Sequence, residues 1–531
     1  MPRHKVLLMG SILLALVACD KDSTGPETGP DFGPTPTTLS LEKIGTFNGG
    51  GVAAAEITAF DSASRRLFVV NGTLGTVDVL DISTPSAPAR VASISVSQFG
   101  AGVNSVAVHD GVVALAIEGV VKTSPGTVAF YRADNLQLLS SVPVGALPDM
   151  VTFTPSGSYL LVANEGEPND AYTIDPEGSV SIIDVRNVAA PTVRTADFSS
   201  YNGQVASLRA SGIRIFGPNA SVAQDVEPEY ITVSGDSRTA YVTLQEANAL
   251  AIVNVEAATV TSVLPWGYKN HNVAGAWLDA SDRDGATGGP LVNILPWPVR
   301  GMYQPDAIAS YSVAGQTYLV TANEGDARDY AGLREEARVS TLALNPSIFT
   351  DAACGGGPCT AAARLGRLNV TSQLGRNASG QFDTLFVFGA RSFSIWTTSA
   401  QLVFDSGDQL EQRTTALPNA MFNASNTGNA LDDRSDNKGP EPEGVALARF
   451  GTKTFAFIGL ERVGGVIVYD VTTPAAPVFV TYFSSRSGDT GDLGPEGLLF
   501  ISATQSPSGK PLLIVGNEIS GTTAIFQINL I

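Results

Sequence analysis

A repeated pair of acidic elements constrains the fold of this chain more than any other feature. Each copy begins with Asp or Glu, in most copies after Pro, and continues through a β-like run and a small-residue turn to a second apolar run. The second run ends in Asn-Glu or a similar pair, so that Asp149 leads to Asn164-Glu165. Self-similarity of this kind indicates a repeat architecture. Further clear copies begin at Glu229, Asp306, Glu443 and Glu496, and weaker ones begin at Glu56 and Asn104.

Two more apolar runs follow the pair in several units, as in Gly465 to Asp470 and Val478 to Phe483, with a Pro-containing turn between them. Four short strands per unit, separated by Gly and Pro turns, are typical of a β-propeller blade. Amphipathic helical patterns are nearly absent, which excludes α/β and α-solenoid folds. We therefore predict an all-β chain that forms a single closed β-propeller of seven or eight four-stranded blades over residues 41–531. Seven units are evident, and a partial eighth spans Asp383 to Glu411.

The run Leu41 to Phe47 precedes the first unit, at the place where a fourth strand is expected. We predict that this strand completes the last blade. Such closure pairs the two ends of the propeller and removes exposed sheet edges.

Propeller topology predicts where the repeated carboxylates lie. The first strand of a blade lines the central channel, and the start of strand one and the end of strand two lie on the same face. Both carboxylates of a unit are therefore expected near the axis, where like charges must bind cations, share protons or accept backbone N–H bonds. Oxygen ligands with almost no His favour Ca²⁺ or another hard divalent cation, while the alternative is a turn-capping role in each blade. The candidate ligands are Asp149, Glu165, Glu229, Glu246, Asp306, Glu324, Glu443, Glu461, Glu496 and Glu518.

The same topology places the long connections on this carboxylate face, and long loops often carry function. They cover residues 166–178, 199–228, 265–304, 325–337, 415–442 and 484–495. Two acidic loops within them, Asp279-x-x-Asp282-x-Asp284 and Asp432-Asp433-x-x-Asp436, are partial ion-binding patterns without EF-hand spacing, or else solvated loops. Arg328, Arg391 and Arg462 adjoin the acidic strand ends and are candidates for anion binding, or for pairing with neighbouring carboxylates.

The N-terminus predicts export and lipid anchoring. Arg3 and Lys5 precede an apolar run to Val17, which is too short for a stable membrane span but suits a signal peptide. The sequence Leu16-Val-Ala-Cys19 is similar to a bacterial lipobox, which implies removal of residues 1–18 and acylation of Cys19. Residues 19–40 then form an acylated Cys and a flexible Gly/Pro/Thr-rich linker. We expect a protein of the bacterial cell envelope, held to a membrane by its lipid and facing the periplasm or the outside.

Composition narrows the possible chemistry. The net charge of −19 makes nucleic acid an unfavourable partner, and three His residues are too few for a multi-His zinc site. Cys354 and Cys359 enclose Gly-Gly-Gly-Pro, and an oxidising envelope favours a disulfide between them.

Five further motifs in the second half of the chain are specific enough to compare with a known family. They are Ala322-Asn-Glu-Gly-Asp-Ala-Arg-Asp-Tyr330, Val403-Phe-Asp-Ser-Gly-Asp408, Lys438-Gly-Pro-Glu-Pro-Glu-Gly444, Gly459-Leu-Glu-Arg462 and Gly491-Asp-Leu-Gly-Pro-Glu-Gly497. With these motifs the chain resembles the choice-of-anchor I family, over about residues 41–531. The resemblance implies an exported β-propeller similar to mesenchyme-specific cell-surface glycoproteins, and some bacterial members are labelled alkaline phosphatase-like. It brings no catalytic residues.

Two functions are compatible with these features. The first is a surface binding or adhesion module whose cation-loaded face recognises an unknown ligand or protein. The second is a metal-dependent phosphoesterase on the same face, with arginines holding the phosphate. The scarcity of His argues mildly against the enzyme.

Overall fold

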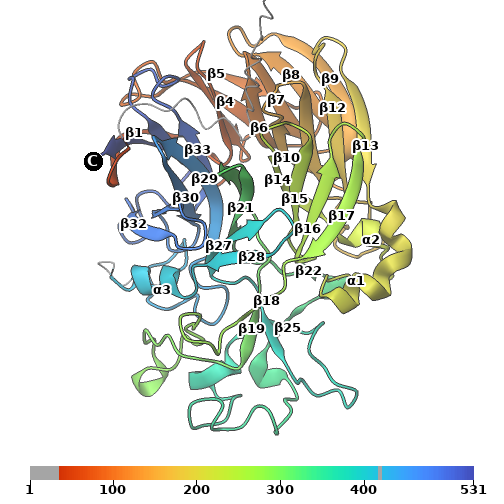
Figure 1. Ribbon diagram of the computed structural model, residues 1–531, viewed down its shortest axis with the longest axis vertical. Coiled ribbons are helices and arrows are strands. Elements are labelled where there is room, and N and C mark those ends of the chain that lie inside the picture. Colours follow the sequence, from red (N-terminus) through yellow and green to blue (C-terminus); the bar gives the residue numbers. More distant parts are fainter. Residues whose placement is uncertain (1–34, 417–420) are drawn as a thin grey trace, which may run out of the picture.

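The computed structural model describes residues 35–416 and 421–531. The predicted signal peptide, Cys19 and most of the linker lie outside these residues. Within the described ranges, seven four-stranded antiparallel sheets surround a common axis (Figure 1). The predicted β-propeller is therefore confirmed, with seven blades.

Each blade has four strands, which follow one another from the axis outward. Blade 1 has β2 (Thr58–Asp61), β3 (Arg66–Asn71), β4 (Thr76–Asp81) and β5 (Ala89–Ser95); blade 2 has β6 (Val103–His109), β7 (Val112–Ile117), β8 (Pro125–Arg132) and β9 (Leu138–Ala146). Blade 3 has β10 (Pro148–Phe153), β11 (Tyr159–Asn164), β12 (Ser179–Asp184) and β13 (Thr192–Asp197); blade 4 has β14 (Pro228–Val233), β15 (Thr239–Leu244), β16 (Ala249–Asn254) and β17 (Thr259–Pro265). Blade 5 has β20 (Ile308–Val313), β21 (Gln316–Asn323), β27 (Ser392–Thr397) and β28 (Leu402–Asp405); blade 6 has β29 (Pro442–Phe450), β30 (Lys453–Leu460), β31 (Val466–Asp470) and β32 (Val478–Phe483). Blade 7 has β33 (Pro495–Ile501), β34 (Leu512–Asn517), β35 (Thr522–Leu530) and β1 (Leu39–Asn48).

The ring closes through both backbone pairing and packing. Strand β1 pairs antiparallel with β35 from Leu39 opposite Leu530 to Asn48 opposite Thr522, which confirms the predicted closure by the N-terminal strand. The first strands contact one another in cyclic order. A separate buried apolar cluster fills each interface between neighbouring blades, including the interface between blades 7 and 1. Burial of these faces is the main stabilising contribution to the ring.

The expected eighth unit over Asp383 to Glu411 is not a separate blade. Its later strands, β27 and β28, pair beside β21 and complete blade 5. The insertion between β21 and β27 is much longer than the predicted loop 325–337, because it extends over residues 324–391. Strand β27 still pairs with β21 across this insertion, because backbone pairing requires proximity in space and not in sequence.

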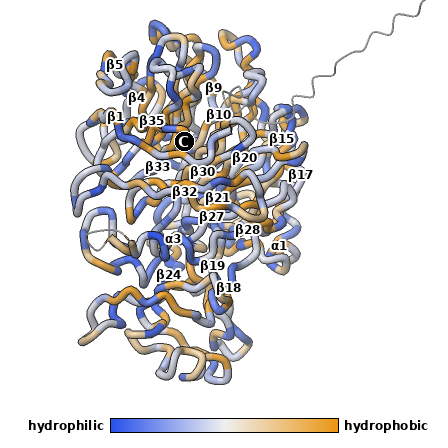
Figure 2. Tube along the Cα trace, turned by 60° about the vertical axis from the view of Figure 1, so that its left-hand side comes forward, coloured by the Kyte–Doolittle hydropathy of each residue, from blue (hydrophilic) through white to orange (hydrophobic). Residues whose placement is uncertain are grey.

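That insertion and residues 266–307 build a module that projects from the propeller around β18, β19 and β25 (Figure 1). Apolar segments occur in this module as well as in the propeller (Figure 2), and a buried cluster that includes Trp297 and Phe382 forms its core. Its strands are β18 (Tyr268–Asn270), β19 (Val299–Met302), β22 (Asp329–Tyr330), β23 (Leu333–Arg334), β24 (Glu336–Arg338), β25 (Asn369–Thr371) and β26 (Leu385–Val387).

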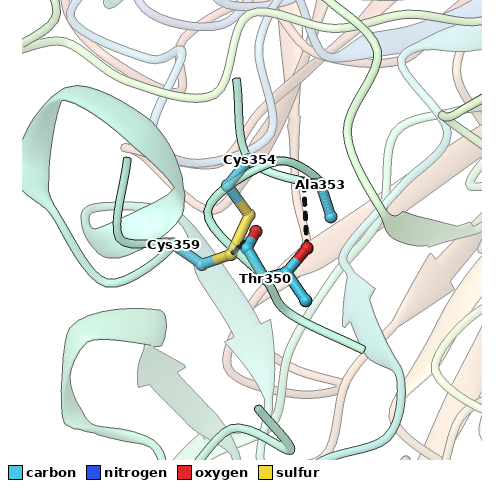
Figure 3. Close-up of a disulfide and its surroundings, with 4 residues drawn as sticks. All are labelled: Thr350, Ala353, Cys354 and Cys359. Atoms are coloured by element: carbon cyan, nitrogen blue, oxygen red, sulfur yellow. Dashed lines mark hydrogen bonds between the residues drawn. A yellow bond between two sulfur atoms is a disulfide. The ribbon is translucent and has the colours of Figure 1, made fainter. Parts of the chain in front are cut away.

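A disulfide joins Cys354 and Cys359 in the core of this module (Figure 3). Both cysteines are buried, and the backbone N–H of Ala353 donates to Thr350 Oγ1 at 3.2 Å in the same loop. The cross-link therefore closes a turn that has little regular structure of its own.

Helices are short throughout the described part of the chain. They are η1 (Ser199–Gln204), α1 (Val205–Ser211), α2 (Val222–Asp225), η2 (Ala286–Gly288), η3 (Val339–Thr341), η4 (Ala362–Gly366) and α3 (Gln409–Thr414). Among the described residues, no helix has both the length and the apolar character needed to cross a membrane.

Candidate functional site: the axial carboxylates

Every blade places one polar side chain at the same position, where its first strand begins. We call the acidic members of this set the axial carboxylates. In most blades the position lies in a β-bulge, as between Pro148 and Val151 in blade 3. A bulge re-aims side chains locally and is common beside functional sites. The seven residues are Glu56, Asn104, Asp149, Glu229, Asp306, Glu443 and Glu496.

An unusual backbone conformation precedes the proline in five blades. Leu147, Glu227, Gln304 and Glu441 have φ values of 46°, 40°, 39° and 50°, and Gly494 occupies the equivalent position with φ of 68°. A positive φ is unfavourable for residues other than glycine, and strain of about 1–3 kcal/mol persists only where the surroundings enforce it. Its recurrence beside the axial carboxylates indicates that their placement is enforced by the fold.

All of the axial carboxylates except Glu56 line a small cavity of about 140 Å³ on the propeller axis. Six of the ten predicted ligands line it, and Asn104, Ser105 and Tyr230 contribute polar groups. No basic side chain of the described chain lines the cavity. The six predicted residues are Asp149, Glu165, Glu229, Asp306, Glu443 and Glu496.

A wider channel of about 530 Å³ runs along the first strands and adjoins this cavity. The two spaces share Ile57, Ser105, Met150 and Tyr230 in their linings. The carboxylates can therefore be approached along the axis from the face that carries the short hairpin turns, which we call the turn face.

Burial makes negative charge on the axial carboxylates unfavourable. Burial raises the pKa of Asp149 to about 6, and burial together with repulsion from Glu518 raises the pKa of Glu56 to about 8. Burial and the surrounding carboxylates also raise the pKa of Glu229, Glu443 and Glu496 well above the usual value. One carboxylate oxygen of each of these three residues is buried without a hydrogen-bond partner among the described residues. Such oxygens require a proton or a cation.

The other four predicted ligands lie outside the axial cavity. Glu324 and Glu461 meet Glu441, which the repeat pattern had not indicated, and their oxygens lie within 4.8 Å of one another. Basic side chains already occupy this cluster: Lys438 Nζ is 2.6 Å from Glu324 Oε1, and Arg462 Nε is 3.1 Å from Glu461 Oε2. Glu246 is buried with a pKa raised to about 8 by burial, and Glu518 lies near Glu56.

The three arginines proposed for anion binding all have carboxylate partners. Arg328 is 1% exposed and contacts Asp225 Oδ1 at 2.8 Å and Glu227 Oε2 at 2.9 Å. Arg391 is also buried and contacts Glu411 Oε1 at 2.7 Å. Arg462 binds Glu441 and Glu461 in the second cluster. These contacts favour the pairing alternative for the arginines.

A third acidic cluster joins residues of two separate loops, Asp279 and Asp284 from one and Asp432 from the other. Asp279, Asp284 and Asp432 offer oxygens within 4.8 Å of one another, and no basic side chain forms a salt bridge with them among the described residues. Burial and mutual repulsion raise the pKa of Asp279 to about 9. Asp282 and Asp436 lie outside this cluster. Their carboxylate oxygens instead bind the Arg367 guanidinium, at 2.8 and 2.7 Å. The buried acidic triads could thus hold a metal ion, and the Asp279 triad lacks the competing lysine of the Glu324 triad.

The loop after β11 and the first part of the insertion after β21 meet on the carboxylate face. Tyr330 Oη donates to Glu167 Oε1 at 2.9 Å, and the rings of Tyr172 and Tyr330 pack edge to face at 5.4 Å. The backbone N–H groups of Ala331 and Gly332 donate to Asp170. These contacts join the loop after β11 and the insertion after β21 into one surface.

Sequence reasoning missed two members of the axial set and one of the second cluster. Glu56 and Asn104 are recognised in the sequence as the starts of weaker repeat copies, but the predicted ligand set does not include them. Glu441 could not be identified from the repeat, because the residue before the proline differs among the blades and is acidic in only some of them.

The family model for the choice-of-anchor I domain matches residues 56–474. Gigasin-3a of Magallana gigas is 31% identical over 185 residues, which cover 31% of this chain and 65% of the relative. The mesenchyme-specific cell surface glycoprotein of Strongylocentrotus purpuratus is 28% identical over 303 residues, which cover 50% of this chain and 38% of the relative. The chain thus spans less than two thirds of either relative.

Solved structures with a similar course of the chain include hydrazine synthase of Kuenenia stuttgartiensis, at 12% identity and a TM-score of 0.45, over 90% of this chain and 96% of that one. Another is the β-propeller domain of Myceliophteria thermophila Cps50 (Swd1), at 9% identity and a TM-score of 0.46, over 92% and 99% of the two chains.

Proposed function

The chain belongs to the choice-of-anchor I domain family, and from this premise we propose that it is an exported binding module whose axial cavity holds a hard divalent cation, Ca²⁺ or Mg²⁺. The observation that carries the proposal is the axial cavity, which six carboxylates line without a basic partner. Carboxylate and amide oxygens are the ligands that these cations prefer. A bound cation would compensate the buried negative charge and connect the first strands of several blades.

Exposed apolar side chains on the carboxylate face support a role in binding. Val52, Val120, Val121 and Ile174 are between 54% and 83% exposed at the tips of loops on this face. Exposed apolar side chains at loop tips are available for contact with a partner. The joined loops around Tyr172 and Tyr330 give this surface a defined shape. The name of the sea-urchin relative, a cell surface glycoprotein, supports display at the cell surface.

The phosphoesterase alternative receives less support from the geometry. In that alternative the arginines hold the phosphate beside the metal. Arg328, Arg391 and Arg462 do not line the axial cavity, and each is bound to carboxylates. We therefore place binding ahead of catalysis.

Metal analysis and thermal melting test the cation. Purified protein should contain Ca²⁺ or Mg²⁺, melt at a lower temperature in chelator, and recover when the cation is returned, because a ligand that binds only the native state stabilises it. The double variant Glu229→Gln/Glu443→Gln should lose this response. Asp110→Asn is the control, since Asp110 is exposed on the turn face. An unchanged response in the double variant would exclude the axial cavity as the source.

Lipid anchoring is tested separately, since Cys19 lies outside the described residues. Cys19→Ala should move the protein from the membrane fraction to the soluble fraction, or leave it unprocessed.

Adhesion is tested by displaying the protein on a heterologous bacterium and measuring cell aggregation in Ca²⁺ and in chelator. Val120→Asp should reduce aggregation without altering the melting temperature.

A further inference from the structure

A second cavity, distinct from the axial one, lies on the turn face between blades 6 and 7. Its volume is about 300 Å³, at the lower end of the range for small-molecule pockets. The hairpin after β29, the hairpin after β33 and the end of β35 form its walls. Phe450, Phe500, Ile528 and Leu530 contribute apolar surface, while Arg449 and Lys510 contribute positive charge.

The charge of this cavity is opposite to that of the whole chain. The net charge is −19, yet no acidic side chain lines the cavity. Within residues 35–416 and 421–531, neither Arg449 nor Lys510 forms a salt bridge. Arg434, Lys438 and Arg462, at the carboxylate face, do form them. Arg449 Nε donates to the carbonyl oxygen of Gly451 at 3.2 Å, which fixes the near end of the guanidinium. Its Nη atoms have no hydrogen-bond partner in the described chain, so they remain able to donate to a ligand.

The apolar part of the cavity is built from packed side chains. Phe450 is 5% exposed and packs edge to face against Phe500, with ring centroids 5.6 Å apart. Ile528 is buried beside them at the end of β35. A preformed aromatic surface with a few placed polar groups is the usual composition of a small-molecule site.

We propose that this cavity binds an organic carboxylate, with the anionic group on Arg449 and Lys510 and a flat apolar body on Phe450 and Phe500. A guanidinium binds a carboxylate through two parallel hydrogen bonds, and an ammonium adds a second charge-assisted donor. Desolvation of the aromatic surface contributes the apolar part of the affinity. This site does not depend on the axial cation, because none of its lining residues lines the axial cavity, although Phe500 also borders the wider channel.

The test uses 2-naphthoate as the probe and 2-naphthamide as its uncharged counterpart, with binding to the full-length protein followed by calorimetry. The protein should bind 2-naphthoate at least tenfold more tightly than 2-naphthamide, and added salt should reduce the difference because it screens exposed charges. The double variant Arg449→Gln/Lys510→Gln should lose the preference. Arg238→Gln is the matched control, because Arg238 is exposed on the corresponding hairpin of blade 4.

Three results would overturn the proposal. They are the absence of saturable naphthoate binding at millimolar concentration, equal affinity for the acid and the amide, and a preference that survives in the double variant. Melting curves of each variant verify folding, and the single variants Arg449→Gln and Lys510→Gln replace the double variant if it fails to fold. Chelator should leave naphthoate binding unchanged whether or not the axial cavity binds a cation, which separates this proposal from the proposed function.

Discussion

Asp279 and Asp432 come from two separate insertions, yet both are fully buried and their carboxylates meet in one cluster with Asp284. Backbone N–H groups of Asn293 and Leu291 donate to them. Burial raises the pKa of Asp432 to about 7 and the pKa of Asp279 to about 9. Two buried acids in such proximity are stable only when a proton or a cation is shared between them.

Asp279→Asn/Asp432→Asn should therefore raise the melting temperature in chelator at pH 8, because it removes the repulsion while nearly preserving shape. It should also remove any stabilisation by Ca²⁺ or Mg²⁺ that this cluster provides. Differential scanning calorimetry measures both effects. Asp282→Asn is the control, and it should be destabilising because Asp282 binds Arg367 at 2.8 Å. A double variant that melts below the native protein in chelator would contradict net repulsion.

Stability in chelator should fall as the pH rises from about 5 to 8. Glu56, Glu246 and Glu461 have pKa values raised from 4.5 to about 8, so the folded state binds more protons than the unfolded state in this window. The free energy of unfolding decreases with pH wherever that is so. Saturating Ca²⁺ should reduce the decline, since a cation replaces the protons. Urea unfolding between pH 5 and 8 measures this change in stability. A urea midpoint that rises with pH in chelator would refute the expectation.

Arg328→Gln should lower the free energy of unfolding by about 3–5 kcal/mol, because it leaves the buried charges of Asp225 and Glu227 without their partner. Arg334→Gln is the matched control from the same loop. The Arg334 side chain is 79% exposed and lies 3.8 Å from Asp329, so its loss should cost less than about 1 kcal/mol. Urea denaturation of both variants measures the difference, and similar values would show that the buried network contributes little.

Gly494→Ala should destabilise the protein by about 1–3 kcal/mol. Its φ of 68° is unfavourable for alanine, and the added Cβ would approach Ile519 Cγ1 to 2.6 Å. Gly203→Ala is the control, because it has no atom within 4 Å of the added Cβ and should be neutral or stabilising. Thermal denaturation distinguishes the two, and a neutral Gly494→Ala would mean that the backbone before the axial carboxylates adapts at little cost.

The sequence by itself determined the repeat, the blade architecture and the closure by the N-terminal strand. Each blade is specified by local signals, namely period-two apolar runs and Gly or Pro turns, which act over a few residues. The acidic elements at Asp149 and Glu229 could be placed at the axis because strand order within a blade is the same in every copy. The sequence leaves open whether the partial unit at Asp383 is an eighth blade, because the first strands to which it belongs, β20 and β21, lie before a long insertion.

Only the tertiary structure decided which acids meet bases and which meet other acids. Glu324 and Glu443 are both predicted ligands, at the end of a second strand and the start of a first strand. Lys438 reaches Glu324 at 2.6 Å, whereas an oxygen of Glu443 is buried without a partner among the described residues. The pairing of Asp279 with Asp432 likewise depends on how separate insertions pack. Side-chain charge acts over a few ångströms of space and carries no periodic signal along the chain, so these contacts exist only once the blades and their insertions are assembled.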